Sequence, residues 1–121
     1  MGRKAEAGQL GVSSRMAGTV MVVDLAGSIR LGDEVSCLRR FLRDCMEERP
    51  PCLLLNFQGV QYVDSAGLGA VVEARAHALA MGAELRCCEL PSLILKLFYQ
   101  IRLGTVIEIY KTEHDALSNW G

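Results

Sequence analysis

The stretch GVQYVDSAGLGAVVEA, from Gly59 to Ala74, decides the fold, because an apolar segment there gives way to a segment with helical spacing. Just before it, CLLLNF at Cys52–Phe57 is short and almost entirely apolar, as in a strand covered on both faces. After Ser65, apolar residues recur at helical intervals until Gly82, where the helix should end. The stretch is therefore predicted to connect a buried strand to a helix, with a turn around Gly59.

Strands and helices are expected to alternate on both sides of this stretch. The further strands are Thr19–Leu25, ended by Gly27, then residues 83–90, and finally Thr105–Tyr110 as the last interior strand. The further helices cover residues 35–46, residues 92–103 and a short C-terminal segment with Thr112 as its N-cap. Residues 9–16 add an edge strand that forms a hairpin with the strand at Thr19.

This alternation predicts an α/β fold, because strands joined by helices build parallel units with right-handed crossovers. A chain of 121 residues suits one domain. We expect a flexible N-terminus at 1–8 and a single domain at 9–121. The domain should hold a central, mostly parallel sheet of four to five strands and about four helices.

Composition narrows the classes of function. Thirteen basic and 14 acidic side chains leave a net charge of −1 without a basic cluster, which argues against nucleic acid as a partner. No apolar run approaches the ~20 residues of a spanning helix, and no secretory signal is visible at the start, so no membrane partner is expected. The five cysteines lack C-x-x-C spacing, which indicates reduced, mostly buried thiols in a cytoplasmic protein, with no disulfide and no metal.

Asp64 and Ser65 stand at the predicted start of the helix. Backbone N–H groups lack partners there and the helix dipole is positive, so a carboxylate or a hydroxyl is favoured. Simple N-capping would explain such a pair on its own. Gly67 and Gly69 add information, because each glycine costs up to ~1 kcal/mol against alanine inside a helix. They predict that another group closely approaches the backbone of this first turn.

Catalytic alternatives do not fit these residues. A hydrolase elbow G-x-S-x-G would need glycine where Val63 stands, and the G-K-[ST] ending of a phosphate-binding loop is absent. His77 and His114 have no partner ligand at helical spacing, so both are interpreted as surface residues. We therefore expect that the protein has no catalytic residue and no cofactor, and that it is not an enzyme. A small anionic ligand or nucleotide at the helix start remains a third possibility.

The segment VDSAGLG, Val63 to Gly69, resembles the D-S-[SAT]-G-L-G signature of STAS domains in bacterial anti-sigma-factor antagonists. The resemblance covers the chain apart from about its first ten residues. It implies that Ser65 is the phosphoacceptor of a partner kinase that also inhibits a sigma factor. The unphosphorylated antagonist would bind that kinase and free the sigma factor, and a phosphatase would reset it. The implied partner-binding residues in the motif are Asp64, Ser65, Ala66, Gly67, Leu68 and Gly69.

The sequence departs from the family's pattern at two places, which bear on the phosphoacceptor and on the identity of the partner. Ala66 replaces a second hydroxyl and leaves Ser65 as the motif's one acceptor. The loop after Gly27 reads G-S-I-R, where many members carry an aspartate two or three residues after the glycine. The alternative function is a STAS scaffold or a transporter-associated regulatory subunit in which Ser65 caps the helix and is never modified.

The predicted helix 92–103 carries more apolar residues than one core-facing side can use. Its core face should comprise Ile94, Leu97, Phe98 and Ile101. Leu95, Tyr99 and Leu103 lie well around the cylinder from that face. Exposed apolar side chains of this kind often mark an interface, so Leu95 and Tyr99 are added to the predicted partner-binding residues.

Overall fold

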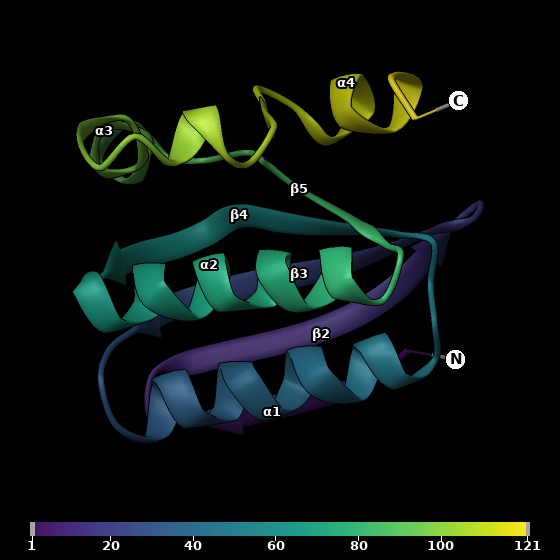
Figure 1. Ribbon diagram of the computed structural model, residues 1–121. Helices are drawn as coiled ribbons and strands as arrows, with labels where there is room; N and C mark the ends of the chain where they lie inside the picture. The colour runs from purple at the N-terminus through teal and green to yellow at the C-terminus, as the bar shows by residue number, and fades with distance from the viewer. Residues whose placement is uncertain (1, 121) are drawn as a thin grey trace.

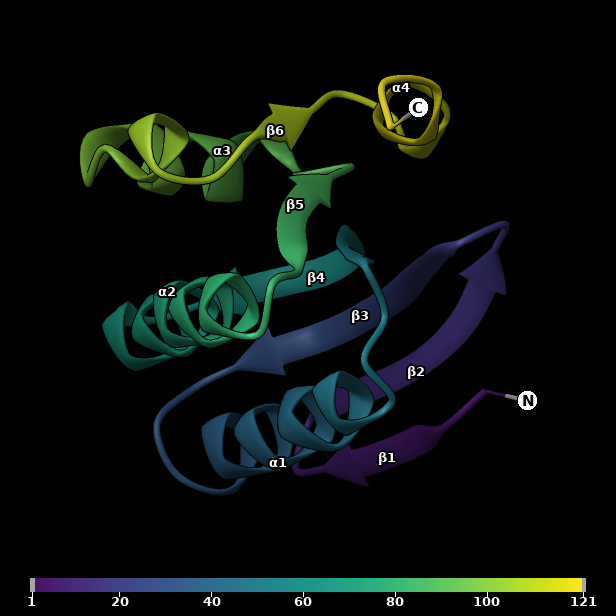
Figure 2. The ribbon, with the colours of Figure 1, turned by 45° about the vertical axis from the view of Figure 1, so that its right-hand side comes forward.

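The computed structural model describes residues 2–120 (Figure 1). Within these residues six strands form one sheet, and their order in the sheet is their order in the chain, β1-β2-β3-β4-β5-β6 (Figure 2). The strands are β1 (Lys4–Ala7), β2 (Leu10–Ala17), β3 (Val20–Ile29), β4 (Cys52–Val63), β5 (Glu84–Cys88) and β6 (Ile109–Tyr110). The helices are α1 (Asp33–Glu47), α2 (Ser65–Ala80), α3 (Ser92–Gln100) and α4 (Glu113–Ser118), with a 3₁₀ turn, η1 (Leu103–Thr105).

The predicted α/β class is confirmed. Strands β3 to β6 pair in parallel, whereas β1, β2 and β3 form antiparallel pairs. The sheet has six strands instead of the expected four to five, and the four helices agree with the prediction. Each parallel connection advances the chain in the same direction across the sheet, so right-handed crossovers place α1, α2 and α3 on the same face.

The two faces of the sheet bury two separate clusters of apolar side chains. The larger cluster lies beneath α1, α2 and α3, and the smaller one lies beneath α4. Alternation along β3 sends Val22 to the smaller cluster and Val23 to the larger one. Cys87 and Cys88 divide in the same way, as expected for neighbours in a strand covered on both faces. All five cysteines are free thiols, and burial raises the pKa of both neighbours, which keeps them protonated.

Strands β3 and β4 continue past the glycines that were predicted to end them. The β3–β4 register shifts between Asp24 and Ala26, and again after Gly27, which marks β-bulges. Gly59 lies within this irregular stretch, where a Cβ atom would come 2.9 Å from the Cβ of Ala26. The predictions of a strand end at Gly27 and a turn at Gly59 are therefore wrong. Both glycines allow two neighbouring chains to approach closely inside the sheet.

The N-terminal segment is more ordered than predicted. Lys4–Ala7, expected within a flexible N-terminus, form β1 along the outer side of β2. Arg3 reinforces this edge through an ion pair from its Nε to Glu48 at 2.7 Å. The predicted hairpin of β2 and β3 is confirmed, but β2 is an interior strand. Alanine, lysine and glutamate are weak strand formers, so pairing with β2 decides this segment's conformation.

The predicted strand Thr105–Tyr110 is also corrected. Only Ile109 and Tyr110 form β6, and they lie at the edge of the sheet. The preceding chain turns through η1, where the Thr105 hydroxyl donates to the carbonyl of Arg102 at 2.7 Å. The predicted cap of α4 is confirmed, since the backbone N–H of Asp115 donates to the Thr112 hydroxyl at 3.0 Å. Among residues 2–120, no helix has the length and apolar character needed to cross a bilayer.

Candidate functional site

The candidate site lies where β3 and β4 end side by side. Ile29 and Val63 are partners in the parallel register, and the backbone N–H of Asp64 donates to the carbonyl of Ile29 at 3.3 Å. The next residue, Ser65, is the first residue of α2. This is the carboxyl edge of the parallel strands, where open α/β sheets usually place their functional groups.

Asp64 connects the loop after β3 to the first turn of α2 through its side chain. It is the N-cap of α2, and its Oδ1 accepts the backbone N–H of Gly67 at 2.8 Å. Its Oδ2 accepts the backbone N–H of Leu31 at 2.9 Å, which ties the loop after β3 to the start of α2. The amides of Leu31 and Gly67 lower the pKa of the Asp64 carboxyl below its ordinary value. Both oxygens of Asp64 are therefore engaged inside the domain.

Ser65 is exposed, and within residues 2–120 no hydrogen bond engages its hydroxyl. The remaining motif residues differ in exposure. Asp64, Ala66 and Gly69 are half-buried, whereas Gly67 and Leu68 are buried. Of the residues predicted to bind a partner, Ser65 thus has the most open side chain within the motif. The first turn of α2 therefore presents the free hydroxyl of Ser65 beside the carboxylate of Asp64, which already accepts two backbone hydrogen bonds.

The two glycines of the motif have different environments. A Cβ atom at Gly67 would lie 2.5 Å from the carbonyl oxygen of Ile29 and 2.8 Å from Cγ1 of Val63. A Cβ atom at Gly69 would meet nothing within 4 Å. The predicted close approach to the backbone is confirmed at Gly67, where the approaching group is the end of β3. The same prediction is wrong at Gly69.

Exposed apolar side chains flank the carboxyl edge. Leu31 is 78% exposed, Tyr62 is 52% exposed and Leu93 is 74% exposed. Tyr62, Leu93 and Leu97 line a shallow cavity between the end of β4 and α3. Sequence reasoning missed Leu93, although its four-residue spacing from Leu97 places both on one side of the helix. These residues form an apolar surface at the same end of the sheet as Ser65.

The other α3 predictions are partly corrected. Tyr99 is 59% exposed and Leu95 is half-buried, but neither lines the cavity beside Tyr62. At helical spacing, Leu95 lies more than a right angle around the helix from Leu97. Leu103, expected outside the core face, is buried, because the helix ends at Gln100 and η1 turns back toward the core. The packing of η1 also explains the half-exposed position of Ile101, which was assigned to the core face.

A buried carboxylate supports the loop that carries Leu31. Glu34, only 5% exposed, accepts hydrogen bonds from the backbone N–H of Gln9 at 2.7 Å and from the Ser28 hydroxyl at 2.9 Å. It also accepts the backbone N–H and the guanidinium of Arg30 at 3.0 and 3.1 Å. Hydrogen bonds, first from the Arg30 guanidinium and then from the Gln9 amide, lower the Glu34 pKa to about 2. Sequence reasoning treated this segment as an ordinary loop.

Glu34 should make the free energy of unfolding depend on pH in the acidic range. Its pKa falls from an ordinary 4.5 to about 2 on folding, so its contribution is complete above pH 4.5 and is lost as the pH falls toward 2. Glu34→Gln should lose this contribution at neutral pH and show a flatter pH dependence below 4.5. Urea unfolding of both proteins at several pH values measures the effect. Parallel pH profiles would contradict it.

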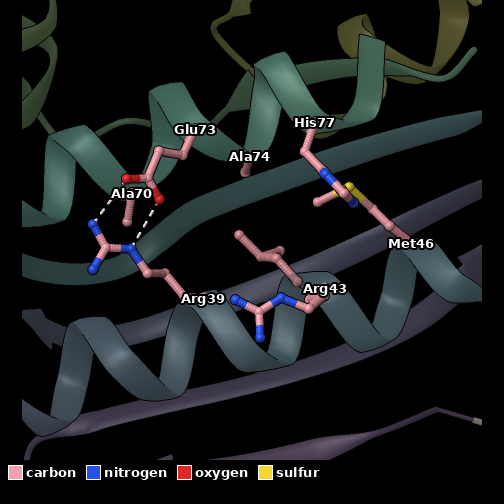
Figure 3. A pocket seen from close by; sticks show the side chains of 8 residues that line it. Arg39, Arg43, Met46, Ala70, Glu73, Ala74 and His77 are labelled. Carbon is pink, nitrogen blue, oxygen red and sulfur yellow. Dashed lines mark hydrogen bonds and ion pairs between the residues drawn. The ribbon is translucent and has the colours of Figure 1, made fainter. Parts of the chain in front are cut away.

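A second groove lies between α1 and α2, away from the motif (Figure 3). Across this groove the guanidinium of Arg39 pairs with the carboxylate of Glu73, with Nε and Oε2 2.9 Å apart. His77 and Met46 point toward one another farther along the groove (Figure 3). In the described part of the chain, no group of three or more histidine, cysteine or acidic residues is arranged to hold a metal ion. The groove brings together none of the residues predicted for the site.

Comparison with known proteins identifies the fold. Residues 12–116 match the family model of the STAS domain. An anti-sigma factor antagonist from Mycobacterium paratuberculosis is similar with a TM-score of 0.82 and 18% identity, over 90% of this chain and 92% of that one. The unphosphorylated form of the anti-sigma factor antagonist SpoIIAA from Bacillus is similar with a TM-score of 0.73 and 19% identity, over 88% of this chain and 92% of that one.

A protein of another functional class shares the fold. A sulfate transporter family protein from Wolinella succinogenes is similar with a TM-score of 0.72 and 18% identity, over 83% of each chain. At such identities the structural likeness shows the fold alone. The family model covers most of the chain, including both strands and the helix that form the site. The chain therefore belongs to the STAS domain family.

Proposed function

We propose that this protein is an anti-sigma-factor antagonist controlled by phosphorylation of Ser65. In the unphosphorylated state it binds an anti-sigma serine kinase in the cytoplasm, and the kinase then releases its sigma factor. Transfer of the ATP γ-phosphoryl group to the Ser65 hydroxyl ends this binding, and a phosphatase restores it. The protein acts as the kinase's substrate and not as a catalyst.

The exposed, unengaged hydroxyl of Ser65 at the start of α2 is the observation that carries this proposal. A kinase can reach this hydroxyl without unfolding the helix. Asp64 holds the first turn in place through the amides of Leu31 and Gly67, so modification leaves the cap intact. The apolar surface of Leu31, Tyr62 and Leu93 supplies contact area at the same end of the sheet. Two similar structures are of anti-sigma factor antagonists, which supports the same function.

Incubation with an anti-sigma serine kinase from the same genome and ATP tests the proposal. We expect one phosphate per chain, located on Ser65 by tandem mass spectrometry, and none on Ser65→Ala. Ser118 in α4 is a matched control, because its hydroxyl donates to the carbonyl of His114 at 2.8 Å. Ser118→Ala should accept phosphate like the wild type. Labelling that survives in Ser65→Ala would disprove the assignment.

The second candidate function is that of a scaffold or a transporter-associated regulatory subunit. The similarity to a sulfate transporter family protein supports it. In this role Ser65 would serve only as the first residue of α2, and its hydroxyl would remain unmodified. A protein that takes up no phosphate from any anti-sigma kinase of its genome would favour this second function.

A further inference from the structure

Arg30 occupies a position next to the proposed phosphoacceptor. It follows Ile29, whose register partner is Val63, so Arg30 and Asp64 are the first residues after the ends of two adjacent strands. The backbone N–H of Asp64 donates to the carbonyl of Ile29 at 3.3 Å, so the two chains are still adjacent at this point. Ser65 is one Cα step of about 3.8 Å farther along, and an extended arginine side chain is longer than that step. The fold therefore brings Arg30, a cation, to the same edge as Ser65.

In the unmodified protein the guanidinium of Arg30 is held by Glu34. Its Nε and one terminal nitrogen each donate to a Glu34 carboxylate oxygen at 3.1 Å. The pair is asymmetric, since the side chain of Arg30 is 47% exposed and that of Glu34 only 6%. The hydrogen bond and charge of Glu34 raise the pKa of Arg30, and the more distant charge of Asp64 acts in the same direction. Arg30 is thus oriented at the surface and already lies within the electrostatic reach of Asp64.

Glu34 does not depend on the guanidinium of Arg30 for its hydrogen bonds. Three other donors bind its carboxylate: the backbone N–H of Gln9, the hydroxyl of Ser28 and the backbone N–H of Arg30. If the guanidinium moves away, this buried carboxylate keeps all three hydrogen bonds. The side chain of Glu34 is only 6% exposed, so the exchange leaves its charge without a cation, a cost that the pair with the phosphate must offset. The three remaining hydrogen bonds hold Glu34 and the loop in place while the guanidinium exchanges partners.

A phosphate on Ser65 would be a stronger acceptor than the Glu34 carboxylate. It carries about −1.5 to −2 charges at neutral pH and three acceptor oxygens. Arginine binds phosphate through two parallel hydrogen bonds, a geometry that lysine cannot reproduce. Asp64 carries a single charge and its two oxygens already accept the amides of Leu31 and Gly67, so it competes weakly with the phosphate for that cation.

We propose that Arg30 is a phosphate-responsive switch, which leaves Glu34 and pairs with the phosphate when Ser65 is modified. This inference rests on the proposed function of Ser65. The movement withdraws the cation from the apolar surface at the moment when the negative phosphate is added. It also draws the loop that carries Leu31 toward α2. Phosphorylation then changes both the charge and the shape of the partner-binding surface, while the sheet and helices stay as they are.

The test uses the full chain with phosphoserine inserted at position 65 during translation, so that no kinase is needed. Phosphorus NMR follows the second ionisation of the phosphate with pH. We expect its pKa to be lower by about 1 in the wild type than in Arg30→Ala, because a nearby cation favours the dianion. Arg30→Lys should give an intermediate value. Arg39→Ala is the matched control, since Arg39 is also a half-exposed arginine paired with a glutamate, and it should titrate like the wild type.

Different outcomes would overturn the pairing of Arg30 with the phosphate and the proposed function of the protein. Equal phosphate pKa values in the wild type, Arg30→Ala and Arg30→Lys would overturn the pairing, even if a kinase labels Ser65. If Arg30→Ala fails to fold, the comparison of Arg30→Lys with the wild type decides, and identical titrations overturn the pairing. If no anti-sigma kinase labels Ser65, the proposed function falls, and the regulatory role of Arg30 falls with it whatever the titration gives.

Discussion

Ser65→Asp should weaken binding to the anti-sigma kinase roughly a hundredfold or more, whereas Ser65→Ala should bind as tightly as the unphosphorylated wild type. Ser65 lies at the same end of the sheet as the exposed apolar residues Leu31, Tyr62 and Leu93. A partner that covers this surface would bury the new carboxylate, while Arg30 at the same edge is already paired with Glu34. An uncompensated charge buried in this way costs about 3–5 kcal/mol. Removing the hydroxyl adds no charge, so Ser65→Ala should bind constitutively and resist the kinase.

Isothermal titration of the three proteins against the kinase measures this difference. Circular dichroism and urea unfolding serve as the folding control. The carboxylate of Ser65→Asp would stand at the N-terminus of α2, where the helix dipole favours negative charge, so the fold should be unchanged. Equal affinities of the two variants would refute control by charge. A partly unfolded Ser65→Asp protein would show that modification acts through stability instead.

Gly67→Ala should destabilise the protein by about 3 kcal/mol, near the upper end of the usual range for overpacking. Its Cβ atom would lie 2.5 Å from the carbonyl oxygen of Ile29, a backbone atom that cannot rotate away. Relief requires α2 to move away from the end of β3, which weakens the hydrogen bond from the Asp64 backbone N–H to the same carbonyl. The substitution should also impair partner binding, because that movement displaces Ser65.

Gly69→Ala is the matched control for this prediction. The same substitution two residues farther along α2 meets nothing within 4 Å, so it should stabilise the helix by up to about 1 kcal/mol. Urea denaturation of both variants gives the two free energies of unfolding. Similar destabilisation by both substitutions would mean that helix geometry, and not the contact with Ile29, explains the glycine at position 67.

Local sequence patterns were sufficient for the parts of the fold that depend on local chemistry. The change from a strand pattern to a helix pattern at Asp64–Ser65 predicted where α2 begins, although β4 runs to Val63, beyond the end predicted at Phe57. Thr112 was identified as the cap of α4 from its side chain alone. The apolar strand at Thr19–Leu25 predicted a sheet covered on both faces, and the structure confirms it. For α2 and α4 the deciding interaction, an N-cap hydrogen bond, lies within three residues of the pattern.

Contacts between distant segments decided the rest. A glycine such as Gly59 serves a turn or a β-bulge equally well, and only the neighbouring strand shows which is present. Lys4–Ala7 form a strand because β2 offers free backbone groups, not because of their composition. Arg30 and Glu34 looked like ordinary loop and helix residues until the fold brought Gln9, Ser28 and Asp64 around them. The sequence by itself determined the order of the elements and the serine at the site. The charged surroundings of that serine depend on residues more than 30 positions away, whose approach only the tertiary structure decides.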